Sequence, residues 1–201
     1  MPDYPSTRRC TMNLWLTIPV GERRKYLKKI IEDSNIPHER IVIVNTFDST
    51  PTPDVHNIYD HGEINIHRWW NKGIEFAKSA GADYIAVLND DLVLSDDPLN
   101  KIAKLMEESN ATLGHPVPHT GHISGYCFIL NLKHNILPDE SYRWWFGDND
   151  LWEQAKKLNG VIGASANVKH LHGNELTSNN PKLMALAEGD KKLYMSRVNE
   201  V

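Results

Sequence analysis

The sequence has little cysteine, no long apolar run and no strong excess of either charge. Its two cysteines, Cys10 and Cys127, lie far apart and outside any C-x-x-C spacing, so they offer no thiolate metal site and fit a reducing compartment. No apolar run reaches the length of a membrane span, and the first residues lack the apolar core of a signal peptide. We therefore expect a cytoplasmic protein with no transmembrane segment.

The charge balance gives little reason to expect a polyanionic partner, because the formal net charge is -4. Nucleic acid is disfavoured as a partner but not excluded, since a local basic patch can exist on the folded surface. A length of 201 residues, with 40% hydrophobic and 24% charged residues, is typical of one globular domain. We expect residues 1–12 to form a flexible N-terminal arm and residues 13–201 to form a single domain.

Strand-like and helix-like patterns alternate along the first half of the chain. Short β-branched runs are typical of buried parallel strands, and apolar residues three and four positions apart predict amphipathic helices. This order is typical of an α/β protein whose mostly parallel sheet is covered by helices. The expected strands are residues 14–20, 41–44 and 84–88, followed by 123–130 and a weaker 161–168. The expected helices are residues 23–34, 68–80, 98–109, 150–158 and 181–195, with a loop at 48–60.

Polar side chains stand at the ends of the three expected parallel strands. Asn89–Asp91 follow the third strand, Asn45 follows the second, and Thr17–Pro19 close the first. Because the carboxyl ends of parallel strands meet at one edge, where open α/β sheets bind ligands, we expect these groups to converge. Oxygen ligands suit Mg²⁺ or Mn²⁺, which are often shared with substrate phosphates. Asp and Asn also favour turns, so the acidic tripeptide alone fits an ordinary loop equally well.

Two further clusters add candidate groups. The stretch WWFGDNDLW places Asp148 and Asp150 near a helix start, where Asp150 can cap the helix while Asp148 is left without that explanation. His170 and His172 alternate along a strand-like segment, which would point both rings the same way. Neutral imidazole is a common metal ligand, although in a chain with ten histidines such a pair is often unrelated to metal.

Five segments, taken in order, resemble the nucleotide-sugar glycosyltransferases of the GT-A fold, particularly family two and its rhamnosyltransferase-like members. They cover about residues 13–178 and read LWLTIPV, RIVIVN, RWWNKGIEFAKSAGADYIAVLNDD, ISGYCFILNLKHNILPDESYRWWFGDNDLWEQAKKLNG and VKHLHGNELTS. The resemblance implies a GT-A, Rossmann-like α/β fold with a mostly parallel sheet flanked by helices and a small antiparallel acceptor-side part. It also implies an enzyme, a hexosyl- or pentosyltransferase that depends on Mn²⁺ or Mg²⁺.

The resemblance assigns roles around the expected metal. Asn89 and Asp91 take the first and third positions of the family's Asp-x-Asp motif, which makes Asp91 the expected metal ligand. Asp90 is expected to contact the ribose or a metal-bound water. His170 falls where the family often has a further metal or diphosphate contact, and His172 is the alternative.

The remaining assignments concern the donor and the base. Asp148 matches the catalytic base, which implies an inverting single displacement. The resemblance implies that the nucleobase pocket is lined by Thr17, Pro19 and Asn45. It also implies that Asn71 lies near the donor and that Arg68 reaches a phosphate. A UDP-sugar is favoured as donor, with dTDP- or GDP-sugars also open, and the acceptor (glycan, protein or modified nucleic-acid base) is unknown.

The sequence departs from the family at three positions. Asn45 stands where the family commonly has Asp for the nucleobase, Asn89 replaces the first Asp, and Gly147 replaces the Glu often found before the base. The first departure weakens the preference for uracil. No Gln-x-x-Arg-Trp motif follows, which argues against a processive polysaccharide synthase.

Two other functions and one aromatic cluster complete the expectations. A sugar nucleotidyltransferase would need a glycine-rich basic loop after the first strand, and PVGERRK offers a single glycine. A catalytically inactive nucleotide-binding module also fits the pattern. Trp144 and Trp145 could stack on a sugar or another planar acceptor, or they could be core or interface aromatics. Trp152 lies inside a helix pattern and is expected to be a core or interface residue.

Overall fold

The computed structural model describes residues 12–21, 24–47, 50–117, 123, 125–173 and 175–198. The arm expected at residues 1–12 lies outside the described residues, except for Met12. The strands are β1 (Leu14–Val20), β2 (Ile41–Asn45), β3 (His56–Tyr59), β4 (Tyr84–Leu88), β5 (Leu92–Ser95), β6 (Leu113–His115), β7 (Cys127–Asn131), β8 (Val161–Gly163) and β9 (Asn167–His170). The α-helices are α1 (Leu27–Asp33), α2 (Ile66–Ser79), α3 (Pro98–Ser109), α4 (Gly147–Lys156), α5 (Glu175–Ser178) and α6 (Pro181–Val198). Short 3-10 turns are η1 (Arg24–Tyr26), η2 (His38–Arg40) and η3 (Leu132–His134).

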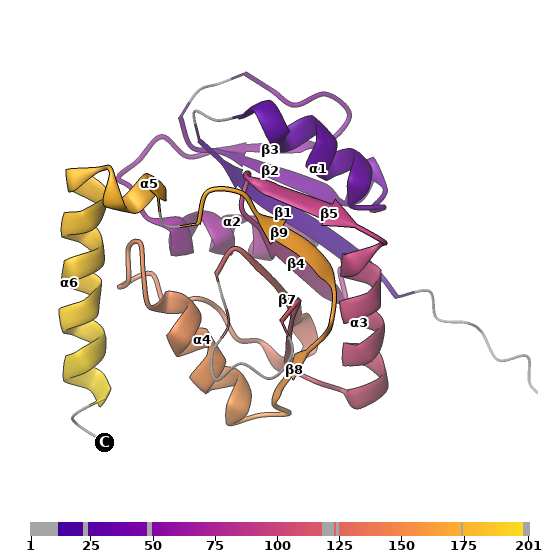
Figure 1. The fold of residues 1–201 in the computed structure, drawn as a ribbon. Helices are drawn as coiled ribbons and strands as arrows, with labels where there is room; N and C mark the ends of the chain where they lie inside the picture. The colour runs from indigo at the N-terminus through magenta and orange to yellow at the C-terminus, as the bar shows by residue number, and fades with distance from the viewer. Residues whose placement is uncertain are drawn as a thin grey trace, which may run out of the picture.

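A seven-stranded sheet in the order β3-β2-β1-β4-β7-β6-β8 forms the centre of the fold (Figure 1). Strands β3, β2, β1 and β4 pair in parallel, β7 runs antiparallel to both β4 and β6, and β8 is parallel to β6. Only β7 therefore runs against the others in this sheet, which confirms the mostly parallel α/β architecture. The register also places the carboxyl ends of β1, β2 and β4 along one edge.

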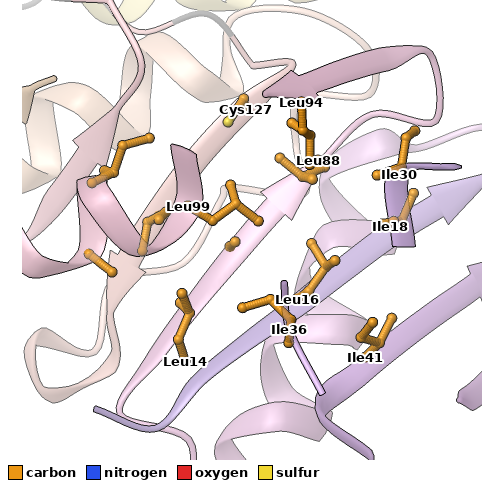
Figure 2. Close-up of a cluster of buried hydrophobic side chains, with 14 of the residues drawn as sticks. Leu14, Leu16, Ile18, Ile30, Ile36, Ile41, Leu88, Leu94, Leu99 and Cys127 are labelled. Atoms are coloured by element: carbon orange, nitrogen blue, oxygen red, sulfur yellow. The ribbon is translucent and has the colours of Figure 1, made fainter. Parts of the chain in front are cut away.

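Both faces of the central strands are buried, which explains why their sequences are continuously apolar. One face packs under α1 and α3 with β5, and Figure 2 shows Leu16, Ile18 and Leu88 meeting Ile30 and Leu99 there. The side chain of Cys127 belongs to this cluster, and burial raises the pKa of its thiol. The opposite face packs against α2 and α4.

Helix α2 approaches β1 very closely because Gly73 faces Thr17. A Cβ added at Gly73 would lie 1.9 Å from Oγ1 of Thr17, so any side chain there would push the helix off the sheet. The helix ends before Gly81, whose φ of +84° is a left-handed conformation that glycine adopts without strain. Along the described part of the chain, no helix combines the length and apolar character needed to cross a bilayer.

The expected elements of the first half are confirmed, with two exceptions. The helix expected at residues 23–34 is the 3-10 turn η1 followed by the shorter α-helix α1. The segment expected as a loop at residues 48–60 contains β3, an edge strand, and the preceding prolines, Pro51 and Pro53, account for the loop-like composition. The second half differs more. The strand expected at residues 123–130 begins only at Cys127, and the weak strand at 161–168 is two strands in different sheets, β8 and β9.

Candidate active site

A cleft of about 1170 Å³ opens at the sheet edge where β1, β2 and β4 end. Six of the predicted site residues line it: Pro19, Asn89, Asp90, Asp91, Asp148 and His170. The fold thus brings residues that are far apart in the sequence to one cavity. They come from the ends of the first parallel strands, the start of α4 and the end of β9.

The closest contact between two predicted metal ligands joins Asp91 and His170. Nε2 of His170 lies 3.1 Å from Oδ1 of Asp91, whose side chain is buried. The backbone supports this contact, because β5 and β9 pair antiparallel and the N–H of Leu171 donates to the carbonyl of Asp91 at 3.0 Å. The imidazole of His170 also stacks on Tyr126, with ring centroids 4.9 Å apart. Both side chains are therefore fixed beside the end of β4.

This donor set fits a hard divalent cation that completes its coordination with substrate oxygens. One carboxylate and one imidazole are too few for a closed protein site, but Mg²⁺ and Mn²⁺ commonly combine few protein ligands with phosphates and water. Among the described residues, no group of three or more His, Cys, Asp or Glu side chains is arranged to hold a metal ion. His172 does not join the pair: its Nε2 lies 3.4 Å from the hydroxyl of Tyr26, and its Nδ1 lies 3.7 Å from Glu175.

The two residues before Asp91 connect strand ends. Oδ2 of Asp90 accepts a hydrogen bond from the N–H of Gly21 at 3.2 Å, which ties the end of β4 to the end of β1. The N–H of Asn89 donates to the carbonyl of Tyr126 at 2.9 Å. These contacts keep the acidic tripeptide at the floor of the cleft.

Asp148 occupies the second position of α4 and faces the cleft. Its Oδ2 accepts a hydrogen bond from the N–H of Gly125 at 3.0 Å, which orients the carboxylate. Asp150, in contrast, is bonded to Gln154 through Oδ2 at 2.7 Å and does not line the cleft. The expectation that Asp150 caps the helix is wrong, because α4 begins at Gly147 and its N-cap position is Phe146, which makes no side-chain cap.

Four residues that the resemblance assigned to the donor lie outside the cleft lining, and three of them are hydrogen-bonded elsewhere. Thr17 is fully buried beneath α2. Nδ2 of Asn45 donates to Asn57 at 3.1 Å, and Nδ2 of Asn71 donates to the carbonyl of Pro138 at 2.9 Å. The two asparagines thus link neighbouring segments, whereas the buried hydroxyl of Thr17 has no hydrogen-bond partner among the described residues.

Arg68, the fourth, forms a two-pronged ion pair with Asp60, with Nε 2.9 Å from Oδ2 and Nη2 3.1 Å from Oδ1. Lys72 adds a third cationic contact to the same carboxylate at 3.0 Å. Burial works to raise the pKa of Asp60, but the hydrogen bonds from Arg68, the Gly62 N–H and Lys72 outweigh it and lower the pKa to about 2. This network fixes the loop that leads into α2.

The C-terminal helix contributes a clamp that the sequence did not predict. Asp190 of α6 is buried, and its carboxylate accepts hydrogen bonds from the N–H groups of Arg143 at 2.9 Å, Trp144 at 2.6 Å and Trp145 at 2.8 Å. This fixes the segment that leads to Asp148. An aspartate inside a polar helix resembles an ordinary surface acid, so no signal in the sequence marks it.

Aromatic side chains from this clamped segment line the cleft. They are Trp144, Trp145 and Phe146, and Phe146 adopts a left-handed φ of +66° while stacking on Tyr194 of α6 at 5.0 Å. Such a conformation is uncommon for a bulky residue and marks a strained position. Trp152 lies outside the cleft lining and is half-buried, packed against the edge of the core and against His115, with ring centroids 5.6 Å apart.

A second residue missed by the sequence reasoning is His67, which is buried and lines the cleft. A Cβ added at Gly147 would lie 2.2 Å from Nε2 of His67. The imidazole therefore occupies the space that a side chain at position 147 would need. This explains the glycine found where the resembled family often has Glu.

No protein-family model matches this chain, and no curated protein matches it either. Solved structures do. The chain resembles TarS of S. aureus (residues 1-349) at a TM-score of 0.61 and 12% identity, over 83% of this chain and 63% of that one. It resembles the mannosyltransferase PcManGT of Pyrobaculum calidifontis, in complex with GDP-Man and Mn²⁺, at a TM-score of 0.60 and 11% identity, over 75% of this chain and 54% of that one. It resembles GalNAc-T7 with UDP, GalNAc and Mn²⁺ at a TM-score of 0.65 and 10% identity, over 81% of this chain and 44% of that one.

The chain spans less than two thirds of the length of each of these proteins. At such low identity the likeness shows the fold alone. The architecture of β3-β2-β1-β4-β7-β6-β8 with its accessory β5-β9 sheet is that of the GT-A glycosyltransferases.

Proposed function

We propose that this protein transfers a sugar from a nucleotide-diphosphate sugar to an acceptor hydroxyl, with the help of a divalent cation. The observation that carries the proposal is the meeting of the Asp91–His170 pair and the Asp148 carboxylate in one cleft, at the carboxyl ends of a parallel sheet. The neighbours support it, since the solved structures include TarS with UDP and with UDP-GlcNAc, and PcManGT with GDP-Man and Mn²⁺.

Asp91 and His170 are the residues that would hold the cation, either Mn²⁺ or Mg²⁺. When bound, the cation supplies positive charge for the donor diphosphate, an effect worth several kcal/mol. The protein's own part is to fix both ligands in place. Strand pairing between β5 and β9 sets the position of His170, and the stacking on Tyr126 sets the plane of its ring.

Asp148 is proposed as the general base. Its carboxylate takes the proton from the acceptor hydroxyl as the hydroxyl oxygen forms a bond to the anomeric carbon. The bond from that carbon to the diphosphate oxygen breaks with its electron pair, and the nucleoside diphosphate leaves. General-base assistance of this kind typically contributes about 10²–10⁴-fold to the rate. A single displacement of this type inverts the anomeric configuration.

Finer features of the proposal follow from the sequence resemblance. They are membership of family two with a rhamnosyltransferase-like relationship, a preference for a UDP-sugar over dTDP- or GDP-sugars, and a cytoplasmic location. Asn89, Asp90 and Pro19 line the cleft and are the donor-contacting residues of this proposal. To contact the donor, Asn45, Arg68 and Asn71 would have to give up their present hydrogen bonds, and Thr17 would have to be uncovered from beneath α2.

A panel of UDP-, dTDP- and GDP-sugars tests the proposal. Thermal unfolding is measured with each one in the presence of Mn²⁺, Mg²⁺ or a chelator, and release of free sugar is then followed for those that bind. We expect one nucleotide class to raise the melting temperature only with metal, and to be slowly hydrolysed. Binding without hydrolysis would favour an inactive nucleotide-binding module. Pyrophosphate release from a nucleoside triphosphate and a sugar 1-phosphate would favour a nucleotidyltransferase.

A further inference from the structure

His67 lies in the wall of the cleft, and the proposed reaction does not use it. It belongs to α2, its side chain is 1% exposed, and its ring meets Trp70 edge-on with centroids 4.9 Å apart. Nδ1 lies 2.8 Å from the carbonyl oxygen of Tyr142. Because a carbonyl oxygen only accepts hydrogen bonds, Nδ1 must carry a proton. The tautomer of the neutral ring is therefore fixed by the backbone.

Burial favours the neutral form of the His67 ring. Burial lowers the pKa of His67, and this outweighs the opposing effects of the Tyr142 carbonyl and of the negative charges of Asp190, Asp139 and Asp150. With the proton on Nδ1, the other nitrogen presents a lone pair. Nε2 forms no hydrogen bond to any residue in the part of the chain that the structure describes. Nε2 of His67 is thus a hydrogen-bond acceptor in the cleft wall that a donor group of a bound molecule could use.

The position of this acceptor is set by Gly147. Nε2 is so near the backbone at Gly147 that a Cβ there would lie 2.2 Å away. The next residue is Asp148, whose carboxylate is anchored on Gly125, and a Cβ at Gly125 would in turn lie 3.0 Å from the ring of Trp70. His67, Trp70 and Asp148 therefore surround one small region of the cleft.

We propose that Nε2 of His67 accepts a hydrogen bond from a second hydroxyl of the acceptor, and that the acceptor is a saccharide. This inference rests on the proposed function. In this proposal Asp148 accepts the proton of the reacting hydroxyl. The lone pair on Nε2 of His67 favours acceptors that carry a second hydrogen-bond donor next to that hydroxyl. Vicinal hydroxyls of a sugar ring meet this requirement, whereas phosphate or carbonyl oxygens do not. His67 is in this sense a specificity-determining residue.

The aromatic wall supports a saccharide as the acceptor. Trp144, Trp145 and Phe146 line the same cleft and lie directly before Gly147 and Asp148. Aromatic rings offer flat apolar surfaces, which suit the C–H face of a pyranose while its hydroxyls reach polar groups at the edge. The backbone of this segment is clamped by Asp190, so the surface is formed before the acceptor binds.

Two substitutions test the roles of the two ring nitrogens of His67 separately. His67→Asn keeps an amide N–H near the position of Nδ1 for the Tyr142 carbonyl but places no atom at the position of Nε2. His67→Gln places an amide near Nε2 and gives up the Nδ1 contact. The acceptors are methyl glucopyranoside, galactopyranoside and mannopyranoside, their monodeoxy forms, and a serine-containing peptide. The donor is the nucleotide sugar that the 201-residue chain hydrolyses in the presence of metal.

We expect wild-type protein to transfer sugar to a methyl pyranoside and to lose activity with one monodeoxy form. His67→Asn should retain donor hydrolysis while kcat/KM for the pyranoside falls by about tenfold to a hundredfold, the range for an unpaired hydrogen-bonding group. The monodeoxy acceptor should lower its kcat/KM no further, because both changes remove the same bond. His67→Gln should recover part of the loss.

Several results would overturn the inference. They are unchanged transfer by His67→Asn, loss of both its donor hydrolysis and its transfer at an unchanged melting temperature, equal wild-type activity with all deoxy acceptors, and absence of transfer to every pyranoside. The deoxy series needs no variant, so the inference is tested even if a substitution impairs folding. Transfer to the peptide alone would end the saccharide inference but keep the proposed function. A wild-type protein that neither binds nor hydrolyses any nucleotide sugar would end both.

Discussion

Nε2 of His170 lies 3.1 Å from Oδ1 of Asp91, although one residue ends β9 and the other follows β4. The contact depends on strand register, because the β5–β9 ladder places Leu92 opposite His170. A slip of one residue in this ladder would turn the imidazole to the opposite face of the sheet. The small two-stranded sheet is thus what completes the candidate metal site.

Substitution of the two histidines should separate their roles. His170→Ala removes the imidazole beside Asp91 and should weaken Mn²⁺-dependent binding of the nucleotide diphosphate by at least about tenfold, the effect that loss of supporting groups at metal sites commonly has. His172→Ala is the matched control, because that ring contacts Tyr26 and Glu175 instead. Calorimetric titration with and without Mn²⁺ measures both. A larger loss for His172→Ala would reverse the assignment.

Substitution of Asp148 and Asp150, the two acids at the start of α4, should have different effects on the rate of transfer. Asp148→Asn can still accept the Gly125 N–H through its amide oxygen, so donor binding should be preserved while transfer falls at least about a hundredfold. Asp150→Asn is the control, since Asp150 is bonded to Gln154 away from the cleft. Initial rates at saturating donor measure the effect. Near-normal turnover of Asp148→Asn would remove it from the reaction.

The sheet was predictable because its signals are local. The continuous apolar runs at β1, β2 and β4 require burial on both faces, and a parallel sheet is the common way to provide it. The carboxyl ends of those strands then had to meet, which brought Pro19 and Asp91 to one cleft. These steps need only the periodicity of the chain and the rules of strand connection.

The parts that escaped prediction depend on long-range partners. Strands β5 and β9 are only four residues each, and no side chain of β9 is fully buried, so neither sequence indicates that the two strands pair. Arg68 was expected at a phosphate, but the position of a guanidinium depends on which carboxylate folds near it, here Asp60. Asp190 and His67 are ordinary helix residues in the sequence. Their importance comes from the backbone groups of 142–145 that pack against them.

Removal of the Asp190 carboxylate should destabilise the protein. Asp190→Ala leaves three backbone N–H groups, those of residues 143–145, without their acceptor. Unpaired buried groups cost about 1–3 kcal/mol each before water enters, so we expect a loss of at least about 2 kcal/mol. For a chain of this size that corresponds to a melting temperature lower by roughly 4–8 °C.

Glu188→Ala, on the exposed side of α6, is the control and should leave the melting temperature within about 1 °C of wild type, as surface substitutions usually do. Thermal unfolding followed by circular dichroism measures both variants. Transfer activity should fall with Asp190→Ala as well, because the segment that carries Trp144 and Trp145 loses its support. Equal melting temperatures for Asp190→Ala and wild type would show that the clamp contributes little.

Acid should weaken the network around Asp60 in a defined range of pH. The folded pKa of Asp60 is about 2, below the ordinary value of 3.8, so the unfolded chain binds a proton at this group more readily. Its contribution to stability, on the order of 2 kcal/mol, is complete well above pH 3.8 and declines as the pH falls toward 2. About half of it should be lost by pH 3.

Urea unfolding of wild type and Asp60→Asn at pH 6, 4 and 3 measures this loss of stability. The difference between the two proteins should shrink as the pH falls, and a constant difference would mean that the ion pairs with Arg68 and Lys72 add nothing to stability.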